Sequence, residues 1–241
     1  RYCYFDHVVR TKNRDSKKSR TPIQVGAELI GSNSVIDDAE LINLMLDTLK
    51  KFTSKKIFLD IGHVGIFKKL MSFAKLEIEQ EKKIKKLIRS KSTSEIKKYL
   101  SDLGIDSTLK ECIGNFPKMH GSIKNILKHA EQLNFFNNNI EDDINRIIRI
   151  SDIVSKSHND VEIKYDFCEL NGFDYENNII FSAYIENDSE AASIGGRYDC
   201  DKEGISGIGF SMDARHLLKY QTNKTKVVNR SGKWVLEVCD E

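Results

Sequence analysis

Three polar residues on two neighbouring predicted strands could bind a small charged molecule. Arg10 ends the first strand, and Gln24 and Glu28 lie four positions apart on the second. Because side chains alternate between the two faces of a strand, Gln24 and Glu28 point to the same face. An arginine suits a carboxylate and a glutamate suits an ammonium group, so the set could hold a small zwitterion. The same residues could equally form a solvated strand face.

Motifs of other kinds of chemistry are missing from the sequence. The chain contains neither a GxxxxGK[ST] loop nor a strand-linked GxGxxG, and neither a GxSxG elbow nor an HExxH helix. The five cysteines are scattered, without a CxxC pair, so we expect them to be reduced and structural. Five isolated histidines fit surface or core positions better than ligand positions: His63, His120, His129, His158 and His216. The sequence therefore predicts no catalytic residue, no metal site and no cofactor.

The charge balance excludes a strong electrostatic partner for the chain as a whole. The 38 Lys and Arg residues nearly cancel the 36 Asp and Glu residues, which leaves a formal net charge of +2. Such a balance lacks the excess positive charge that is typical of proteins that bind nucleic acid or an anionic membrane. No apolar run approaches the roughly 18 residues of a membrane-spanning helix, so we expect a cytoplasmic protein.

The elements that must position the polar residues begin with a pair of strands. The first thirty residues predict two antiparallel strands, joined by the basic loop TKNRDSKKSR, whose simplest interpretation is a solvated hairpin tip. Asp37, followed three positions later by Glu40, predicts the N-cap of a helix over about 38–52. The segment KIFLDIGH after this helix predicts a short buried strand that runs into a turn.

The rest of the chain separates into helices and then strands. From about 65 to 155 the strand signals vanish and the apolar spacing predicts a helical subregion of five or six helices. After residue 160 four strand patterns follow, and a helix around DARHLLKY closes the chain. This order favours one α+β domain over residues 1–241, with a mainly antiparallel sheet flanked by helices and not built from βαβ units.

Several segments resemble motifs of one known family. RYCYFDHVVR and RTPIQVGAELIG resemble motif 2 of class II aminoacyl-tRNA synthetases in its histidyl-specific form. NGFDYENNIIFSAY resembles the first histidine-binding signature of that family and IGGRYD the second, while GIGFSMDARHLL lies where the third class II motif belongs. The resemblance implies a class II synthetase-like fold, an antiparallel sheet flanked by helices, in agreement with the α+β prediction.

Departures from the synthetase pattern fall on residues that handle the nucleotide. Asn171 stands where the synthetases have a charge-stabilising arginine, and Glu176 replaces a tyrosine. Lys12 replaces an acidic ATP contact, and His216, with Arg215 beside it, stands in place of the motif 3 arginine. Losing the arginine removes electrostatic stabilisation on which adenylyl chemistry depends. We also expect no anticodon-binding domain, because the chain ends soon after the last predicted helix.

This pattern resembles the histidyl-tRNA synthetase-like regulatory subunits of ATP phosphoribosyltransferase. The resemblance implies a non-catalytic protein that does not charge tRNA, is a homodimer, and assembles with a short-form catalytic subunit under feedback control by histidine. It also implies a histidine-type pocket whose six residues are Arg10, Gln24, Glu28, Asn171, Tyr175 and Tyr198. Since the chain opens on Arg1 within a predicted strand, we expect that an upstream part with the first class II motif is missing.

Two other functions stay open at this point. A divergent or truncated histidyl-tRNA synthetase would form histidyl-adenylate, and would need Arg215 or another cation for the nucleotide. A stand-alone amino-acid-binding module, or a tRNA-mimicking partner of another enzyme, would use the same pocket without affecting a phosphoribosyltransferase.

Overall fold

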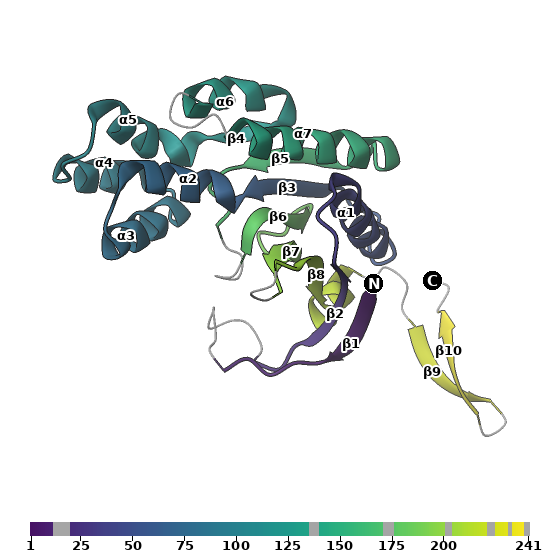
Figure 1. The fold of residues 1–241 in the computed structure, drawn as a ribbon. Helices are drawn as coiled ribbons and strands as arrows, with labels where there is room; N and C mark the ends of the chain where they lie inside the picture. Colours follow the sequence, from purple (N-terminus) through teal and green to yellow (C-terminus); the bar gives the residue numbers. More distant parts are fainter. Residues whose placement is uncertain are drawn as a thin grey trace.

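An eight-stranded sheet with helices on one face forms the body of the protein in a computed structural model (Figure 1). The structure describes residues 1–11, 20–134, 140–170, 176–200, 204–220, 225–230 and 233–238. Residues 12–19, which make up most of the predicted basic loop, lie outside the described part.

The strand order in the sheet is β1-β2-β8-β7-β6-β3-β5-β4. All neighbouring strands are antiparallel except β3 and β5. The two N-terminal strands form the predicted antiparallel pair, with Tyr4 opposite Gly26. The strands are β1 (Tyr2–His7), β2 (Ile23–Ile30), β3 (Ile57–His63), β4 (His120–Ser122), β5 (Glu162–Asp166), β6 (Glu176–Ile185), β7 (Ala191–Asp199) and β8 (Ser206–Asp213).

The parallel pair β3–β5 is an exception within the sheet, which was predicted to be mainly antiparallel. Leu59 pairs with Ile163 and Ile61 with Tyr165 in the parallel register. Because parallel neighbours need a long crossover, the helical subregion between β3 and β5 serves as that connection. The short strand β4, which pairs with β5, lies within the range 65–155 and was not predicted.

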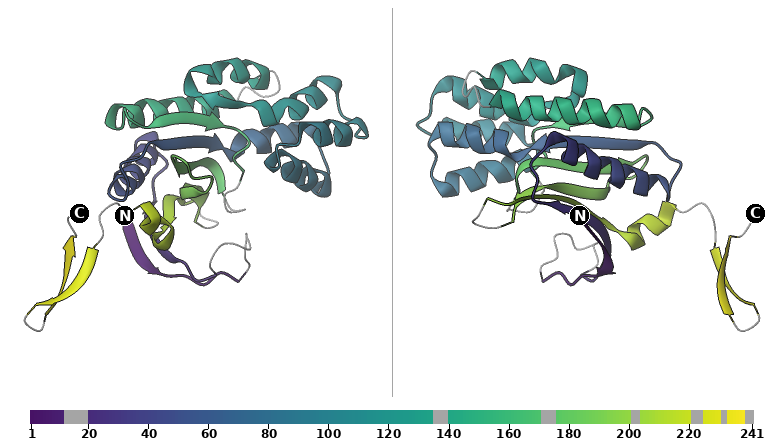
Figure 2. Two further views of the ribbon diagram at one scale, coloured as in Figure 1. Left: turned by 180° about the vertical axis from the view of Figure 1, so that it is seen from behind. Right: turned by 45° about the vertical axis from the view of Figure 1, so that its right-hand side comes forward.

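The described residues of the predicted helical subregion contain six helices, in agreement with the expected five or six. They are α2 (Val64–Ala74), α3 (Ile78–Arg89), α4 (Thr93–Ser101), α5 (Ser107–Asn115), α6 (Ile126–Asn134) and α7 (Ile140–Ser157), with short 3₁₀ turns at Phe116–Lys118 and Ile123–Asn125. Helix α7 packs beside α1 (Val35–Lys50) over the sheet (Figures 1 and 2). Fully buried residues such as Leu46, Leu59 and Ile147 fill the layer between helices and strands.

Helix α1 begins three residues before its predicted start. Its N-cap is Ser34, whose hydroxyl accepts from the Asp37 N–H at 3.1 Å, so the prediction of Asp37 as N-cap was wrong. Serine and aspartate are equally good caps, so residue type alone could not decide between them. Glu40, predicted as the reciprocal partner of Asp37, instead accepts two hydrogen bonds from Arg1, at 2.8 and 2.9 Å.

The C-terminal part holds one predicted element and one that was missed. The helix predicted around DARHLLKY is present as α8 (Ala214–Leu217) and a 3₁₀ turn (Leu218–Tyr220). Strands β9 (Thr225–Arg230) and β10 (Lys233–Val238), which the sequence analysis did not predict, pair with each other in a second sheet (Figure 2). Within the described ranges, every helix is too short or too polar to cross a membrane.

Candidate functional site

A small cavity opens on the face of the sheet opposite α1 and α7, and we call it the strand pocket. Gln24 and Glu28 line it from β2, as their four-residue spacing predicts. Register brings further residues to the same face, since Tyr4 lies opposite Gly26 and Gly209 opposite Glu28. The cavity measures about 90 Å³. Its lining is Tyr4, Gln24, Glu28, Ile194, Gly195, Gly196, Tyr198, Gly209, Phe210 and Ser211.

Two hydrogen bonds hold the polar side chains of the strand pocket in place. The Tyr198 hydroxyl donates to Glu28 Oε2 at 2.7 Å, and Gln24 Nε2 donates to the Tyr4 hydroxyl oxygen at 3.0 Å. Four strands, β1, β2, β7 and β8, thus contribute polar side chains or glycines to the same cavity. Gln24, Glu28 and Tyr198, three of the six predicted pocket residues, are brought together here.

Glycine at position 209 makes room for the carboxylate of Glu28. A Cβ added at Gly209 would overlap the Glu28 carboxylate, and one added at Gly26 would overlap the Tyr4 hydroxyl group. No side chain larger than a hydrogen atom fits at either position without displacing a pocket residue. The glycines of GISGIGF therefore shape the strand pocket as well as the packing of the sheet.

Burial makes the charge on Glu28 costly in the empty pocket. It raises the pKa of Glu28, and the hydrogen bond from Tyr198 offsets only part of this effect. Burial and the nearby Glu28 carboxylate also raise the pKa of Tyr4, so its phenol keeps its proton. A carboxylate in this position gains most from a ligand that brings a cationic or strongly donating nitrogen.

Arg10 lies in a neighbouring cavity of about 260 Å³ and does not line the strand pocket. Strand β1 ends at His7, so the prediction that Arg10 ends the strand was wrong, although the Arg10 N–H still donates to the Arg20 carbonyl at 2.8 Å. Gln24 lines both cavities, and Arg215 joins Arg10 in the larger one. Arg10, Gln24 and Glu28 were predicted to converge on one site, but Arg10 and Glu28 line different cavities and only Gln24 lines both.

His216 also lines this neighbouring cavity and is engaged with acidic side chains. Its Nε2 lies 3.2 Å from Asp188 Oδ2, and its Nδ1 lies 3.2 Å from Glu190 Oε2. The cavity thus combines the cations of Arg10 and Arg215 with carboxylates.

Two predicted pocket residues, Asn171 and Tyr175, lie outside the described residues. The backbone of Glu176 is described and pairs with Tyr198 in the β6–β7 ladder, which brings the first signature next to the second. Among the residues that the structure describes, no three His, Cys, Asp or Glu side chains come close enough to hold a metal ion.

Tyr4 is one of the pocket residues that the sequence analysis missed. It sits on the predicted first strand, and alternation alone gives Tyr2 and Tyr4 the same face. The missing information was the strand register, which sets Tyr4 opposite Gly26 and thereby over the pocket.

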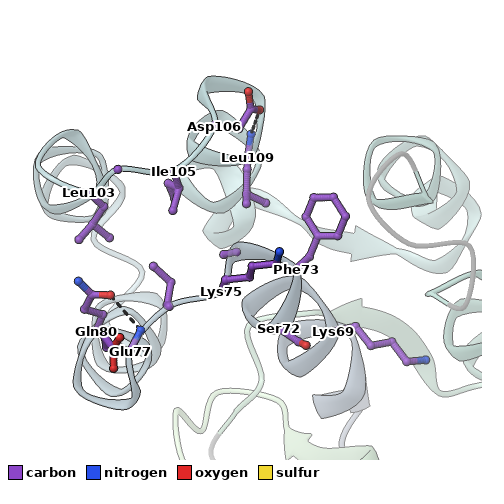
Figure 3. Close-up of a pocket in the computed structure, with 13 residues that line it drawn as sticks. Lys69, Ser72, Phe73, Lys75, Glu77, Gln80, Leu103, Ile105, Asp106 and Leu109 are labelled. Carbon is purple, nitrogen blue, oxygen red and sulfur yellow. Dashed lines mark hydrogen bonds between the residues drawn. The ribbon is translucent and has the colours of Figure 1, made fainter.

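A larger cavity, of about 910 Å³, lies in the helical subregion between α2, α3 and the α4–α5 connection (Figure 3). Its wall is apolar on the side of Leu103, Ile105 and Leu109. Two of its polar side chains serve as helix caps: Asp106 accepts from the Leu109 N–H at 3.2 Å, and Gln80 accepts from the Glu77 N–H at 3.0 Å. Polar groups used in this way do not converge on a ligand, so the strand pocket is the better candidate site.

Comparison with known proteins places this chain and its fold in a family. The model of the histidyl-tRNA synthetase family matches residues 1–217. The ATP phosphoribosyltransferase regulatory subunit of Hahella chejuensis is 32% identical over 236 residues, which cover 96% of this chain and 58% of that protein. The corresponding subunit of Teredinibacter turnerae is 33% identical over 217 residues, 88% of this chain and 55% of that protein. The chain thus spans little more than half the length of these relatives.

Solved structures show the same fold at lower identity. An ATP phosphoribosyltransferase regulatory subunit/histidyl-tRNA synthetase from Bacillus halodurans superposes with a TM-score of 0.76 at 19% identity, over 91% of this chain and 58% of that one. A chain of the ATP phosphoribosyl transferase (HisG:HisZ) complex from Thermotoga maritima superposes with a TM-score of 0.68 at 21% identity, over 87% of this chain and 71% of that one. These matches confirm the predicted class II synthetase-like α+β fold. The chain belongs to the histidyl-tRNA synthetase-like family, and the curated relatives described above are ATP phosphoribosyltransferase regulatory subunits.

Proposed function

We propose that the protein is a non-catalytic regulatory subunit of ATP phosphoribosyltransferase, which catalyses the first step of histidine biosynthesis. The observation that carries this proposal is the 32% identity to a regulatory subunit across 96% of the chain. The partner is a separate short-form catalytic subunit that condenses ATP with phosphoribosyl pyrophosphate. A protein that works with these substrates acts in the cytoplasm.

Histidine is the effector that the strand pocket suits. Glu28 offers a carboxylate to an ammonium or imidazolium group, and Tyr198, Tyr4 and Gln24 offer hydrogen-bonding groups on three sides. A site built to pair with polar ligand groups rejects analogues that lack them, because its own buried groups are then left unpaired. Asn171 and Tyr175 would complete this pocket from the segment between β5 and β6.

A homodimer within a larger hetero-oligomer is the assembly that we infer. Strand β1 is the edge of the sheet, and its Tyr2 and Phe5 side chains are 68% and 70% exposed. Large apolar side chains on an open edge favour coverage by another chain. We propose further that residues 1–241 act as one class II synthetase-like domain that includes the helical subregion.

Reconstitution with the short-form catalytic subunit of the same genome tests the regulatory function. ATP and phosphoribosyl pyrophosphate should condense rapidly only when both proteins are present, and histidine should inhibit the mixture. The catalytic subunit alone and this chain alone are the controls. An unchanged rate on adding this chain, folded by circular dichroism, would exclude the regulatory function.

A second function, histidyl-adenylate formation, is favoured by one observation. Arg10 and Arg215 line the same cavity beside the strand pocket, where two cations could hold a nucleotide. Histidine-dependent exchange of pyrophosphate into ATP separates the two functions. We expect no exchange, because Asn171 stands in place of the arginine that stabilises charge in the synthetases; rapid exchange would make the protein a divergent synthetase.

A further inference from the structure

Two buried charges and one that is partly buried lie directly behind the strand pocket, on the helical face of the sheet. Asp38 is 0% exposed and Arg197 is 1% exposed. Arg197 donates from Nε and Nη2 to Asp38 Oδ1, at 2.9 and 2.6 Å. Arg146 donates from Nε to the second carboxylate oxygen, Oδ2, at 2.7 Å. One carboxylate therefore joins two arginines, and we call these residues the Asp38 triad.

The Asp38 triad connects elements that are far apart in the sequence. Asp38 lies in the first turn of α1, Arg197 on β7 and Arg146 on α7. Arg197 also donates to the Ser206 hydroxyl at 2.8 Å, at the start of β8. Arg146 donates to the Asn33 carbonyl at 3.2 Å, just before α1.

Arg197 and Tyr198 are consecutive residues on opposite faces of β7. Tyr198 donates to Glu28 in the strand pocket, while Arg197 reaches into the layer of helices. Gly207, next to Ser206, packs against the Tyr198 ring, since a Cβ there would lie 2.9 Å from its Cζ atom. The triad thus fixes the backbone of both strands that hold Tyr198 in place.

We propose that the Asp38 triad positions Tyr198 and Glu28 for ligand binding and couples the occupancy of the strand pocket to helix α7. This inference rests on the proposed histidine pocket. Separating either arginine from a shared buried carboxylate has a high free-energy cost. A displacement of β7 is therefore accompanied by a displacement of α7. A ligand that fixes Tyr198 therefore also fixes Arg197, Asp38 and the α7 residue bound to it. Helix α7 is itself part of the helical subregion, where this coupling becomes available to a partner.

The test compares three substitutions on α7. Arg146→Met removes the cation, Arg146→Lys keeps it, and Arg149→Met removes an exposed cation of the same helix as the matched control. Histidine affinity is measured by calorimetric titration on the full chain, below each variant's unfolding temperature. We expect Arg146→Met to weaken histidine binding by roughly 5- to 30-fold, Arg146→Lys to recover most of the loss, and Arg149→Met to match the wild type. A purely structural role would lower the unfolding temperature and leave the affinity of the folded protein unchanged.

Hydrogen exchange supplies a second measurement on the wild-type protein. Histidine should slow amide exchange in α7 around Arg146 as well as in β7, and leave the distant helix α3 unchanged. Histidine binding that protects β7 but not α7 would overturn the coupling, even if Arg146→Met fails to fold.

Failure of the proposed pocket is distinguishable from failure of the triad. If wild-type protein does not bind histidine, the pocket assignment and its coupling to α7 are refuted together. The positioning role is then decided without ligand: amides of residues 197–199 should exchange faster in the Arg146 variants than in the Arg149 control. Equal rates would overturn that role too.

Discussion

Replacing Glu28 with glutamine should separate ligand binding from stability. Glutamine keeps the shape of the side chain and an oxygen that can accept from Tyr198, but it carries no charge. A hydrogen bond to a charged group contributes about 1.5–3 kcal/mol. Since about 1.4 kcal/mol corresponds to a tenfold change, Glu28→Gln should weaken histidine binding by about 10- to 100-fold. Calorimetric titration of histidine into both proteins measures this difference directly.

The ligand-free stability of Glu28→Gln should move in the opposite direction. Burial raises the pKa of Glu28 in the folded protein, so its stabilising contribution is present at low pH and is lost as the pH rises through the folded-state pKa. At neutral pH the charged carboxylate disfavours the empty folded state, and glutamine removes that cost. We expect the unfolding temperature of Glu28→Gln to equal or exceed that of the wild type at pH 7, with the advantage disappearing in acid. Lower stability at pH 7 together with unchanged histidine affinity would refute this account of the pocket.

Three further predictions concern the pocket glycine, the buried triad and a buried histidine. Gly209→Ala should abolish histidine binding in titration, because the added methyl group would overlap the Glu28 carboxylate. Gly204→Ala is the control for backbone strain, because Gly204 has a φ of +76° and does not line the pocket. Asp38→Asn should lower the free energy of unfolding in urea by about 3–5 kcal/mol, because two arginines lose their buried partner; a change under about 1 kcal/mol would contradict this. His63 is 3% exposed and burial lowers its pKa to about 3, so stability should fall as the pH drops from about 6.5 towards 3. His63→Gln should show a flatter dependence in acid denaturation, and an unchanged slope would argue against this assignment.

The sequence was enough to predict three of the ten residues that line the strand pocket. The two-residue period of a strand correctly put Gln24 and Glu28 on one face, and the IGGRYD signature supplied Tyr198. Arg10 was misplaced because β1 ends at His7, and the point where a strand stops pairing depends on its partner more than on its own residues.

Long-range pairing explains what the sequence analysis missed. Tyr4 enters the pocket only through the register with Gly26, and β3 pairs with β5 across the whole helical subregion. Asp38 and Arg197 are 159 positions apart, so no local pattern links the two charges. The helices were easier to predict, because their apolar spacing is contained within each segment.

The parallel pair β3–β5 also sets an order of events during folding. Strand β3 ends at His63 and β5 begins at Glu162, so the two strands meet only after residues 64–161 have doubled back. Helices form from contacts close in sequence, whereas pairing of distant strands requires the entropic cost of closing the intervening loop. Compact helices between the strands shorten that effective loop. We therefore expect the helices of this subregion to form before β3 and β5 pair, near the β4 edge of the sheet.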